Sequence, residues 1–316
     1  MDMYQKRKIR AEKKNNDSQK SFSKVPISWY PGHMAKTKKE IINDLGLIDV
    51  VIEVIDSRIP MSSRNPDIGE MTKNKKKIIV MNKIDLSDEK QNNLWANYLS
   101  KDGIKTVLVD SNTGKGVSEV LRQVENIMKD ELEKSAAKGR IGKKIRVMIL
   151  GIPNVGKSSF INRVAKNNRL EVANRPGVTR KKQWIRVNDK VELLDTPGVL
   201  WPKFNNNEVA LNLAFTGTIK DDVLDKTEVA YQLLKFLIEN YRDNLTQRYN
   251  LTNEYIEEKL NQEQAENVNI YEIMQEIGRR RGAIVSGGNI DDEKTAAIIL
   301  EDFRSCKLGK ITLERL

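Results

Sequence analysis

One segment of the chain has the residue types and spacing of a phosphate-binding loop. Gly151-Ile-Pro-Asn-Val-Gly-Lys-Ser158 matches the pattern G-x-x-x-x-G-K-[ST] between an apolar run and a helical pattern. The glycines let the backbone fold around phosphates, so that N–H groups and a helix N-terminus point at the anion. Lys157 would reach the β- and γ-phosphates, and Ser158 would bind Mg²⁺. The predicted phosphate contacts in this loop are Asn154, Val155, Gly156, Lys157, Ser158 and Ser159.

A second motif, Asp195-Thr-Pro-Gly198, follows the apolar run Val191–Leu194. A carboxylate at a strand end that faces a phosphate loop can hold Mg²⁺ through water, and the Gly198 amide can sense a γ-phosphate. Between the two motifs, Thr179 ends the segment Arg175-Pro-Gly-Val-Thr and offers a hydroxyl and a carbonyl to the metal and the γ-phosphate. The predicted Mg²⁺ ligands are Ser158, Thr179 and Asp195, and Thr179 and Gly198 join the predicted phosphate contacts.

A third motif, Asn82-Lys83-Ile-Asp85, has groups that would select guanine. A carboxylate accepts hydrogen bonds from both the N1–H and the N2 amino group of guanine, a pair of donors that adenine does not offer. We predict that Asp85 reads the base, that Asn82 contacts the purine edge and that the Lys83 stem lies along its face. The Ser111-Asn112 turn would add a backbone donor to guanine O6. A P-loop kinase or metabolic phosphotransferase is an alternative, but neither requires a guanine reader.

An alternation of strands and helices must position these motifs. Runs rich in β-branched residues predict strands at Leu47–Ile55, Lys77–Met81, Lys105–Val109, Ile145–Leu150, Gln183–Val187 and Val191–Leu194. Apolar residues three or four apart predict helices at Glu89–Leu99, at Val117–Met128, from near Lys157, and then at Val229–Ile238, Glu254–Leu260, Ile270–Ile277 and Lys294–Phe303. We therefore expect an α/β domain with a mainly parallel sheet, followed by a smaller all-helical domain.

The order of the motifs is unusual. In ordinary GTPases the base-reading motifs follow the phosphate loop, whereas Asn82–Asp85 and Ser111 precede Gly151. The same Ras-like sheet forms if the chain is cut elsewhere and its old ends are joined. We predict a circularly permuted P-loop GTPase domain at 28–205, joined within the basic stretch Lys134–Lys144, and a helical domain at 206–316. Because the chain leads from Asp195 directly into the helical domain, hydrolysis could change the orientation of that domain relative to the α/β domain.

Composition excludes several classes of protein. The chain has 316 residues, with 55 Lys and Arg against 44 Asp and Glu, which gives a formal net charge of +11. One cysteine and one histidine exclude an internal disulfide framework and a Cys/His zinc site within one chain. No apolar run approaches the ~20 residues of a membrane span, and the charged first residues do not form a signal peptide. We expect a soluble, cytoplasmic monomer without membrane contact.

The positive charge is concentrated in clusters. Residues 1–25 carry eight basic and three acidic residues with little apolar content, and we interpret 1–27 as a disordered arm. The segment Lys134–Arg146 contains six basic residues and no acidic one, and Arg279–Arg281 forms a third cluster. Any one cluster could be a solvated helix face. Their occurrence together favours a partner rich in phosphate.

The motifs together resemble the circularly permuted GTPases of the ribosome biogenesis GTPase A family. The resemblance runs from about residue 28 to the end, at Trp29–Ala35, Ile59–Pro66, Asn82–Asp85, Gly151–Ser158, Arg175–Thr179, Asp195–Phe204, Ser286–Gly288 and Asp302–Leu308. It implies hydrolysis of GTP to GDP at a low intrinsic rate, stimulated by the large ribosomal subunit whose late assembly the protein serves. It also implies that the helical domain contacts rRNA of the subunit precursor. The charged arm before Lys24 lies outside the resemblance.

The motifs alone do not identify the group that activates water. Ras-like enzymes place a Gln directly after the DxxG motif, but Val199 occupies that position and cannot hydrogen-bond through its side chain. His33 could accept a proton from the water or orient it, and it could equally pack beside Trp29. The resemblance implies the catalytic role for His33.

Two questions stay open at the level of sequence. Arg58, Arg64 and Arg180 are rival charge stabilisers for the reaction. Asn154 occupies the position at which related GTPases coordinate K⁺ beside the phosphates, and it could instead brace the loop. The alternative function is a nucleotide-gated RNA-binding scaffold with negligible hydrolysis.

Overall fold

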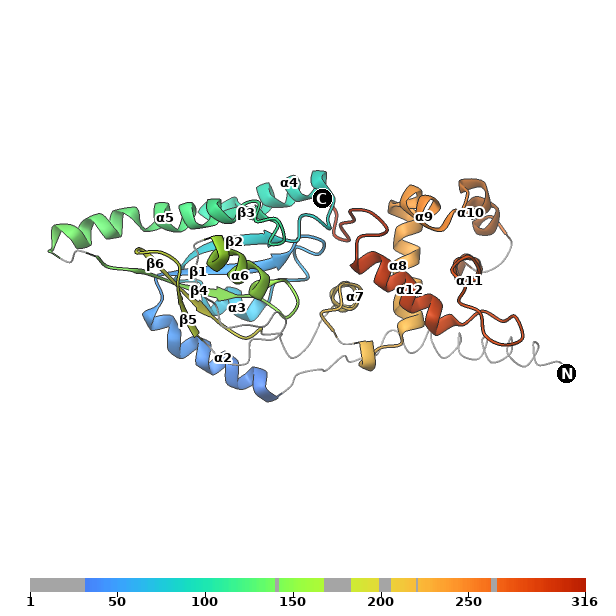
Figure 1. The fold of residues 1–316 in the computed structure, drawn as a ribbon, viewed down its shortest axis with the longest axis horizontal. Helices are drawn as coiled ribbons and strands as arrows, with labels where there is room; N and C mark the ends of the chain where they lie inside the picture. Colours follow the sequence, from blue (N-terminus) through green and yellow to red (C-terminus); the bar gives the residue numbers. More distant parts are fainter. Residues whose placement is uncertain (1–31, 140–141, 168–182, 199–205, 220, 263–265) are drawn as a thin grey trace.

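A six-stranded sheet forms the first part of the protein. The computed structural model describes residues 32–139, 142–167, 183–198, 206–219, 221–262 and 266–316. The strands are β1 (Val50–Asp56), β2 (Lys76–Asn82), β3 (Lys105–Val109), β4 (Ile145–Leu150), β5 (Gln183–Arg186) and β6 (Val191–Asp195). Their order is β3-β2-β1-β4-β6-β5, and only the edge strand β5 runs antiparallel to its neighbour (Figure 1). The predicted α/β fold with a mainly parallel sheet is confirmed.

Helices cover both faces of this sheet. On one face lie α2 (Gly32–Asp44), α3 (Pro66–Met71) and α4 (Glu89–Leu99), and on the other lie α5 (Val117–Ala137) and α6 (Lys157–Asn167). Along β1, Val50, Ile52 and Val54 belong to the core beneath α5 and α6, whereas Val51 and Ile55 pack toward the opposite helices. This alternation, with every residue of β1 buried, explains why five of its seven residues are apolar; the other two are the buried carboxylates Glu53 and Asp56.

Several boundaries differ from the sequence prediction, and two of them have a clear local cause. The run predicted as a strand from Leu47 begins as a strand only at Val50, because Leu45–Leu47 forms a 3₁₀ turn that leaves Leu47 56% exposed. Helix α5 continues to Ala137, since no helix breaker occurs before Gly139, which has a φ of +77°. The connection between α5 and β4 is therefore shorter than the predicted joining stretch Lys134–Lys144.

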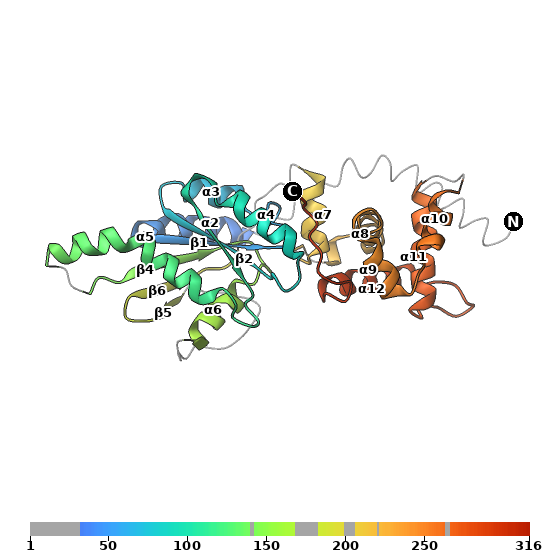
Figure 2. The same cartoon turned by 90° about the horizontal axis from the view of Figure 1, so that it is seen from above.

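The second part of the chain is helical. Its helices are α7 (Asn207–Phe215), α8 (Lys226–Asn240), α9 (Arg242–Tyr249), α10 (Asn253–Leu260), α11 (Glu266–Arg280) and α12 (Asp292–Arg304). Figures 1 and 2 both place them beyond one end of the sheet. The sequence prediction missed two of them. The residues of α7 are mostly apolar, so their hydrophobicity does not alternate with a helical period. Helix α9 buries only Leu245 and Tyr249, which are too few to form a recognisable helical pattern.

The last residues of the chain, 305–316, return from the helices to the carboxyl ends of the strands; we call them the tail. The N–H of Ile311 donates to the Leu86 carbonyl at 3.1 Å, and the N–H of Leu313 donates to the Arg58 carbonyl at 2.8 Å. The indole N–H of Trp95 donates to the Glu314 carbonyl at 2.7 Å. The helical part is thus bonded to the loops that follow β1 and β2.

Candidate nucleotide-binding site

Asn82, at the carboxyl end of β2, joins two of the predicted motifs. Its Nδ2 donates to the Val155 carbonyl at 2.9 Å, and its Oδ1 accepts from the Ser111 hydroxyl at 2.7 Å and from the Ser111 N–H at 3.3 Å. Asn82 and Ser111 are both buried. The structure therefore brings together the base-reading loop, the Ser111 turn and the phosphate loop. Asn82 braces these loops, and its contact with a purine edge stays a prediction.

Lys83 also reaches across to the phosphate loop. Its backbone has a φ of +65°, and its Nζ donates to the Asp56 carboxylate at 2.8 Å and to the Asn154 carbonyl at 2.5 Å. Burial lowers the pKa of Lys83, although the attraction of Asp56 opposes this effect. The ammonium is therefore fixed at the junction of the two loops, and the contact of its stem with a base stays a prediction.

The carboxylate of Asp85 has one occupied and one unoccupied oxygen. Oδ2 accepts a hydrogen bond from Nδ2 of Asn112 at 3.0 Å. Oδ1 is buried and accepts no hydrogen bond from the described residues. A buried carboxylate oxygen without a donor is costly, and an N–H group of guanine would supply the missing bond. In this turn the N–H of Asn112 donates to Asp110 at 2.8 Å and that of Ser111 donates to Asn82 at 3.3 Å. The backbone donor from the turn to guanine O6 stays a prediction.

The phosphate loop has the backbone that its glycines permit. Asn154 and Gly156 have φ values of +64° and +93°, and a Cβ on Gly156 would lie 2.3 Å from Nδ2 of Asn82. Glycine is therefore required at this position for the base-reading loop to approach. Val155 is buried, Ser158 is half-buried and Ser159 is exposed in the first turn of α6.

Lys157 lies folded into the loop that precedes it. Its Nζ donates to the carbonyls of Gly151 at 3.1 Å and Ile152 at 2.9 Å. Burial lowers the pKa of Lys157 to about 8, and the attraction of Asp195 opposes part of that shift. A nucleotide phosphate would compete for this ammonium and would favour its charged form.

The Asp195 motif lies beside the phosphate loop. Asp195 is buried, and the hydroxyl of Thr196 donates to the Ile149 carbonyl at 2.6 Å, which fixes the end of β6 to β4. A Cβ on Gly198 would lie 2.8 Å from the Pro153 nitrogen and 3.0 Å from Nζ of Lys157. Gly198 therefore approaches the lysine that the phosphates would contact. Thr179, Arg180 and Val199 lie outside the described residues.

The oxygen donors at this junction suit magnesium. Ser158 follows Lys157 directly, and Asp195 is close enough to Lys157 to influence its pKa. Hydroxyl and carboxylate oxygens are ligands that Mg²⁺ prefers, with the remaining positions filled by phosphate and water. Among the described residues, no cluster of three His, Cys, Asp or Glu side chains forms a metal cage. Magnesium held here would therefore depend on the nucleotide for part of its coordination.

The structure changes the interpretation of two arginines. Arg58 is buried and donates through Nε and Nη2 to both carboxylate oxygens of Asp56, and it lies over the ring of Phe303. Arg64 pairs with Glu53 at 3.2 Å. These two of the three rival charge stabilisers are thus engaged in ion pairs. His33 lies in the first turn of α2.

Sequence reasoning missed three residues beside the site. Asp56 binds both Arg58 and Lys83, and Gly217 accepts a hydrogen bond from Nδ2 of Asn154 at 2.7 Å. Glu314 accepts from the backbone N–H of Ser62 at 2.8 Å, and its burial raises its pKa. Asp56 directly follows a predicted strand, and this position at a strand end could have marked it as a candidate site residue. Gly217 and Glu314 lie far along the chain from their partners and carry no local signal.

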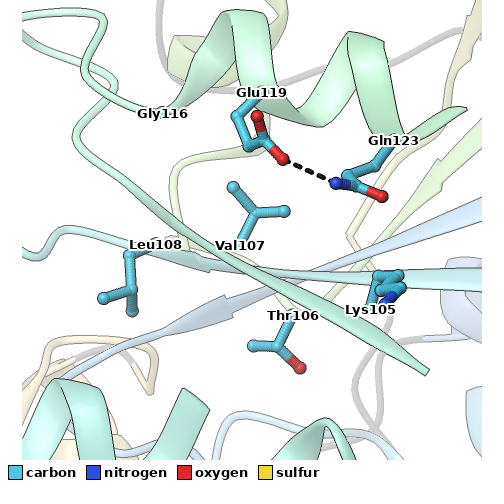
Figure 3. Close-up of a pocket in the computed structure, with 7 residues that line it drawn as sticks. All are labelled: Lys105, Thr106, Val107, Leu108, Gly116, Glu119 and Gln123. Carbon is cyan, nitrogen blue, oxygen red and sulfur yellow. Dashed lines mark hydrogen bonds between the residues drawn. The ribbon is translucent and has the colours of Figure 1, made fainter. Parts of the chain in front are cut away.

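A separate hollow of about 290 Å³ lies between β3 and α5 (Figure 3). It is lined by Lys105, Thr106, Val107, Leu108, Gly116, Glu119 and Gln123. Glu119 and Gln123 are hydrogen-bonded to each other at 2.6 Å. None of the residues predicted to bind nucleotide lines this hollow, so it is not the candidate site.

Comparison with known proteins identifies the class and then the family. A family model described as 50S ribosome-binding GTPase matches residues 146–272. The match begins in β4, the strand that immediately precedes the phosphate loop. A GDP-bound YlqF structure has a TM-score of 0.61 at 22% identity and covers 87% of this chain and 98% of that chain. GNP-bound YlqF from T. maritima has a TM-score of 0.59 at 23% identity, covering 89% and 98%. At these identities the likeness concerns the fold, which is that of a P-loop GTPase.

The relatives define the family more narrowly. "Ribosome biogenesis GTPase A" of Bacillus licheniformis is 44% identical over 289 residues, which cover 92% of this chain and 98% of the relative. "Mitochondrial ribosome-associated GTPase 1" of Bos taurus is 36% identical over 234 residues, 71% of this chain and 69% of the relative. The chain belongs to the ribosome biogenesis GTPase A family. None of the described helices is long and apolar enough to cross a membrane.

Proposed function

We propose that this protein binds GTP and GDP at the junction of the base-reading and phosphate loops, and that it hydrolyses GTP with Mg²⁺ during late assembly of the large ribosomal subunit. The observation that carries the proposal is the bonding of Asn82 to both Ser111 and Val155. It joins loops that would hold the base and the phosphates, although the base-reading motif comes first in the chain. This order is that of a circularly permuted GTPase domain, which we assign to 28–205.

The helical domain at 206–316 is the proposed contact with rRNA of the subunit precursor. Its contacts with the candidate site support a dependence on the nucleotide, because Gly217 is bonded to Asn154 in the phosphate loop and the tail is bonded to Leu86 beside Asp85. A change at either loop would thus alter the attachment of the helices. We propose that the basic arm at 1–27 adds phosphate contacts and that the protein acts as a cytoplasmic monomer.

Nucleotide selectivity tests the first part of the proposal. Titration of the full chain with GDP, ADP and XDP in the presence of Mg²⁺ should give strong preference for GDP. Asp85→Asn should weaken GDP and strengthen XDP, because xanthine carries a carbonyl where guanine carries an amino group and so needs a donor. Equal affinity for ADP and GDP in the unmodified chain would contradict guanine recognition and favour a P-loop phosphotransferase.

Stimulation by ribosomal subunits tests the second part. GTP turnover should rise strongly when large subunits are added and should respond weakly to small subunits, which serve as the matched control. Turnover that stays negligible with both, while GTP-dependent binding to large subunits persists, would contradict the enzymatic role and favour the scaffold.

A further inference from the structure

The side chain of Asn112 occupies an oxygen that the base would need. Its Nδ2 donates to Oδ2 of Asp85 at 3.0 Å, whereas Oδ1 of Asp85 is buried and accepts no hydrogen bond from the described residues. Guanine has two donors for a carboxylate, N1–H and the N2 amino group. One oxygen of the Asp85 carboxylate is therefore available to a donor of the base, whereas the other already accepts a hydrogen bond from the protein.

The loop that carries Asn112 is fixed on both sides. Oδ1 of Asp110 accepts from the N–H groups of Asn112 and Thr113 at 2.8 and 3.2 Å, and Oδ2 accepts from the Thr113 hydroxyl at 2.6 Å. Ser111 is bonded to Asn82, and Asp110 pairs with Lys115 in an isolated β-bridge. The backbone of Asn112 is therefore set in place, while its exposed side chain is free to rotate away from Asp85.

We propose that Asn112 is an internal stand-in for guanine: its amide group imitates one base donor at Asp85 and must leave Oδ2 before a guanosine nucleotide can engage both oxygens. This inference rests on the proposed guanine recognition by Asp85. The hydrogen bond from Asn112 to Asp85 stabilises the nucleotide-free form of the protein. Because this bond must be broken when a guanosine nucleotide binds, it weakens the affinity for that nucleotide. It acts on the second donor only, because a base with a single N–H can use Oδ1 and leave Asn112 where it is.

Hypoxanthine distinguishes this role from simple support of the loop. Its nucleotide, IDP, has N1–H but lacks the N2 amino group of GDP. Under the proposal, Asn112→Ala strengthens GDP binding by about three- to tenfold, the worth of one hydrogen bond that no longer has to be broken. The affinity for IDP changes by less than about twofold. The ratio of GDP affinity to IDP affinity therefore rises in the variant.

The experiment is calorimetric titration of the full chain with GDP and with IDP at one Mg²⁺ concentration. Lys115→Ala, an exposed substitution on the same loop, is the matched control and should leave both affinities unchanged. An equal loss of GDP and IDP affinity in Asn112→Ala would make Asn112 a support of the loop and overturn the proposal, as would an unchanged ratio. Failure of the unmodified chain to prefer GDP over ADP would instead remove the proposed function itself, and the inference with it.

Discussion

The ammonium of Lys83 lies 2.8 Å from the Asp56 carboxylate and also donates to the Asn154 carbonyl. One side chain thus joins the loop after β2, the end of β1 and the phosphate loop. Asp56 is also bonded to the buried guanidinium of Arg58. Burial alone would raise the pKa of Asp56, but the charges of Arg58 and Lys83 outweigh it and hold that pKa well below its usual range.

Removing the charge of Asp56 should destabilise the protein strongly. Asp56→Asn would leave Arg58 buried without its counter-ion, and the free energy of unfolding should fall by about 3–5 kcal/mol. Denaturant unfolding measures the change. Asp189→Asn, which removes an exposed ion pair with Arg186, is the control and should cost less than about 1 kcal/mol. Similar costs for both substitutions would show that the Asp56 pair contributes no more than a surface pair.

The depressed pKa of Lys157 should make nucleotide binding depend on pH. In the protein without nucleotide, Lys157 loses its proton near pH 8, whereas bound phosphates favour the ammonium and raise its pKa. Binding above pH 8 therefore takes up a proton, and GDP affinity should fall as pH rises, by at most about tenfold per pH unit. Calorimetry between pH 7.5 and 9.5 measures this slope. Lys157→Met should bind weakly and lack the slope; an equal slope in that variant would assign it to another group.

Asn154 should determine whether K⁺ supports the reaction. Its Nδ2 is bonded to the Gly217 carbonyl, so the oxygen of the same amide is the atom that a cation would contact. We expect subunit-stimulated GTP turnover to be faster in KCl than in NaCl, and Asn154→Ala to abolish the difference. Turnover that is the same in both salts for the unmodified chain would leave Asn154 with a bracing role alone.

His33→Ala should separate catalysis from binding. If His33 orients or deprotonates the attacking water, the variant should lose subunit-stimulated turnover while its affinity for GDP is unchanged. Single-turnover hydrolysis and GDP titration on the same preparation measure the two effects. Lys39→Ala, on the same helix α2, is the control. Full turnover in His33→Ala would exclude the catalytic role.

The sequence predicted the parts of the site that depend on local pattern. The strands β3 and β4 and the helix α4 have the expected bounds, because their apolar periods and flanking polar residues are clear over a few positions. The carboxyl ends of parallel strands lie on one edge of a sheet, so Asn82 and the phosphate loop were expected to meet, as they do.

The contacts that the sequence did not reveal all depend on tertiary structure. The stem of Lys83 was expected along a purine face, which stays a prediction; that its ammonium is held by Asp56, 27 positions away in the chain, was not foreseen. Glu314 reaches Ser62 across 252 positions. Asp56 and Lys83 meet because β1 and β2 are neighbours in the sheet, whereas Glu314 meets Ser62 because the tail packs against the strand ends. The spacing of these residues along the chain marks neither pair as partners.

The hydrogen bond from Trp95 to the Glu314 carbonyl has a practical consequence. The indole is 5% exposed and lies on α4, while its acceptor belongs to the tail of the helical part. Detachment of the tail would expose this ring to water and shift its fluorescence to longer wavelength. The protein therefore contains its own optical reporter, through which movements of the helices could be followed in real time without attaching a dye.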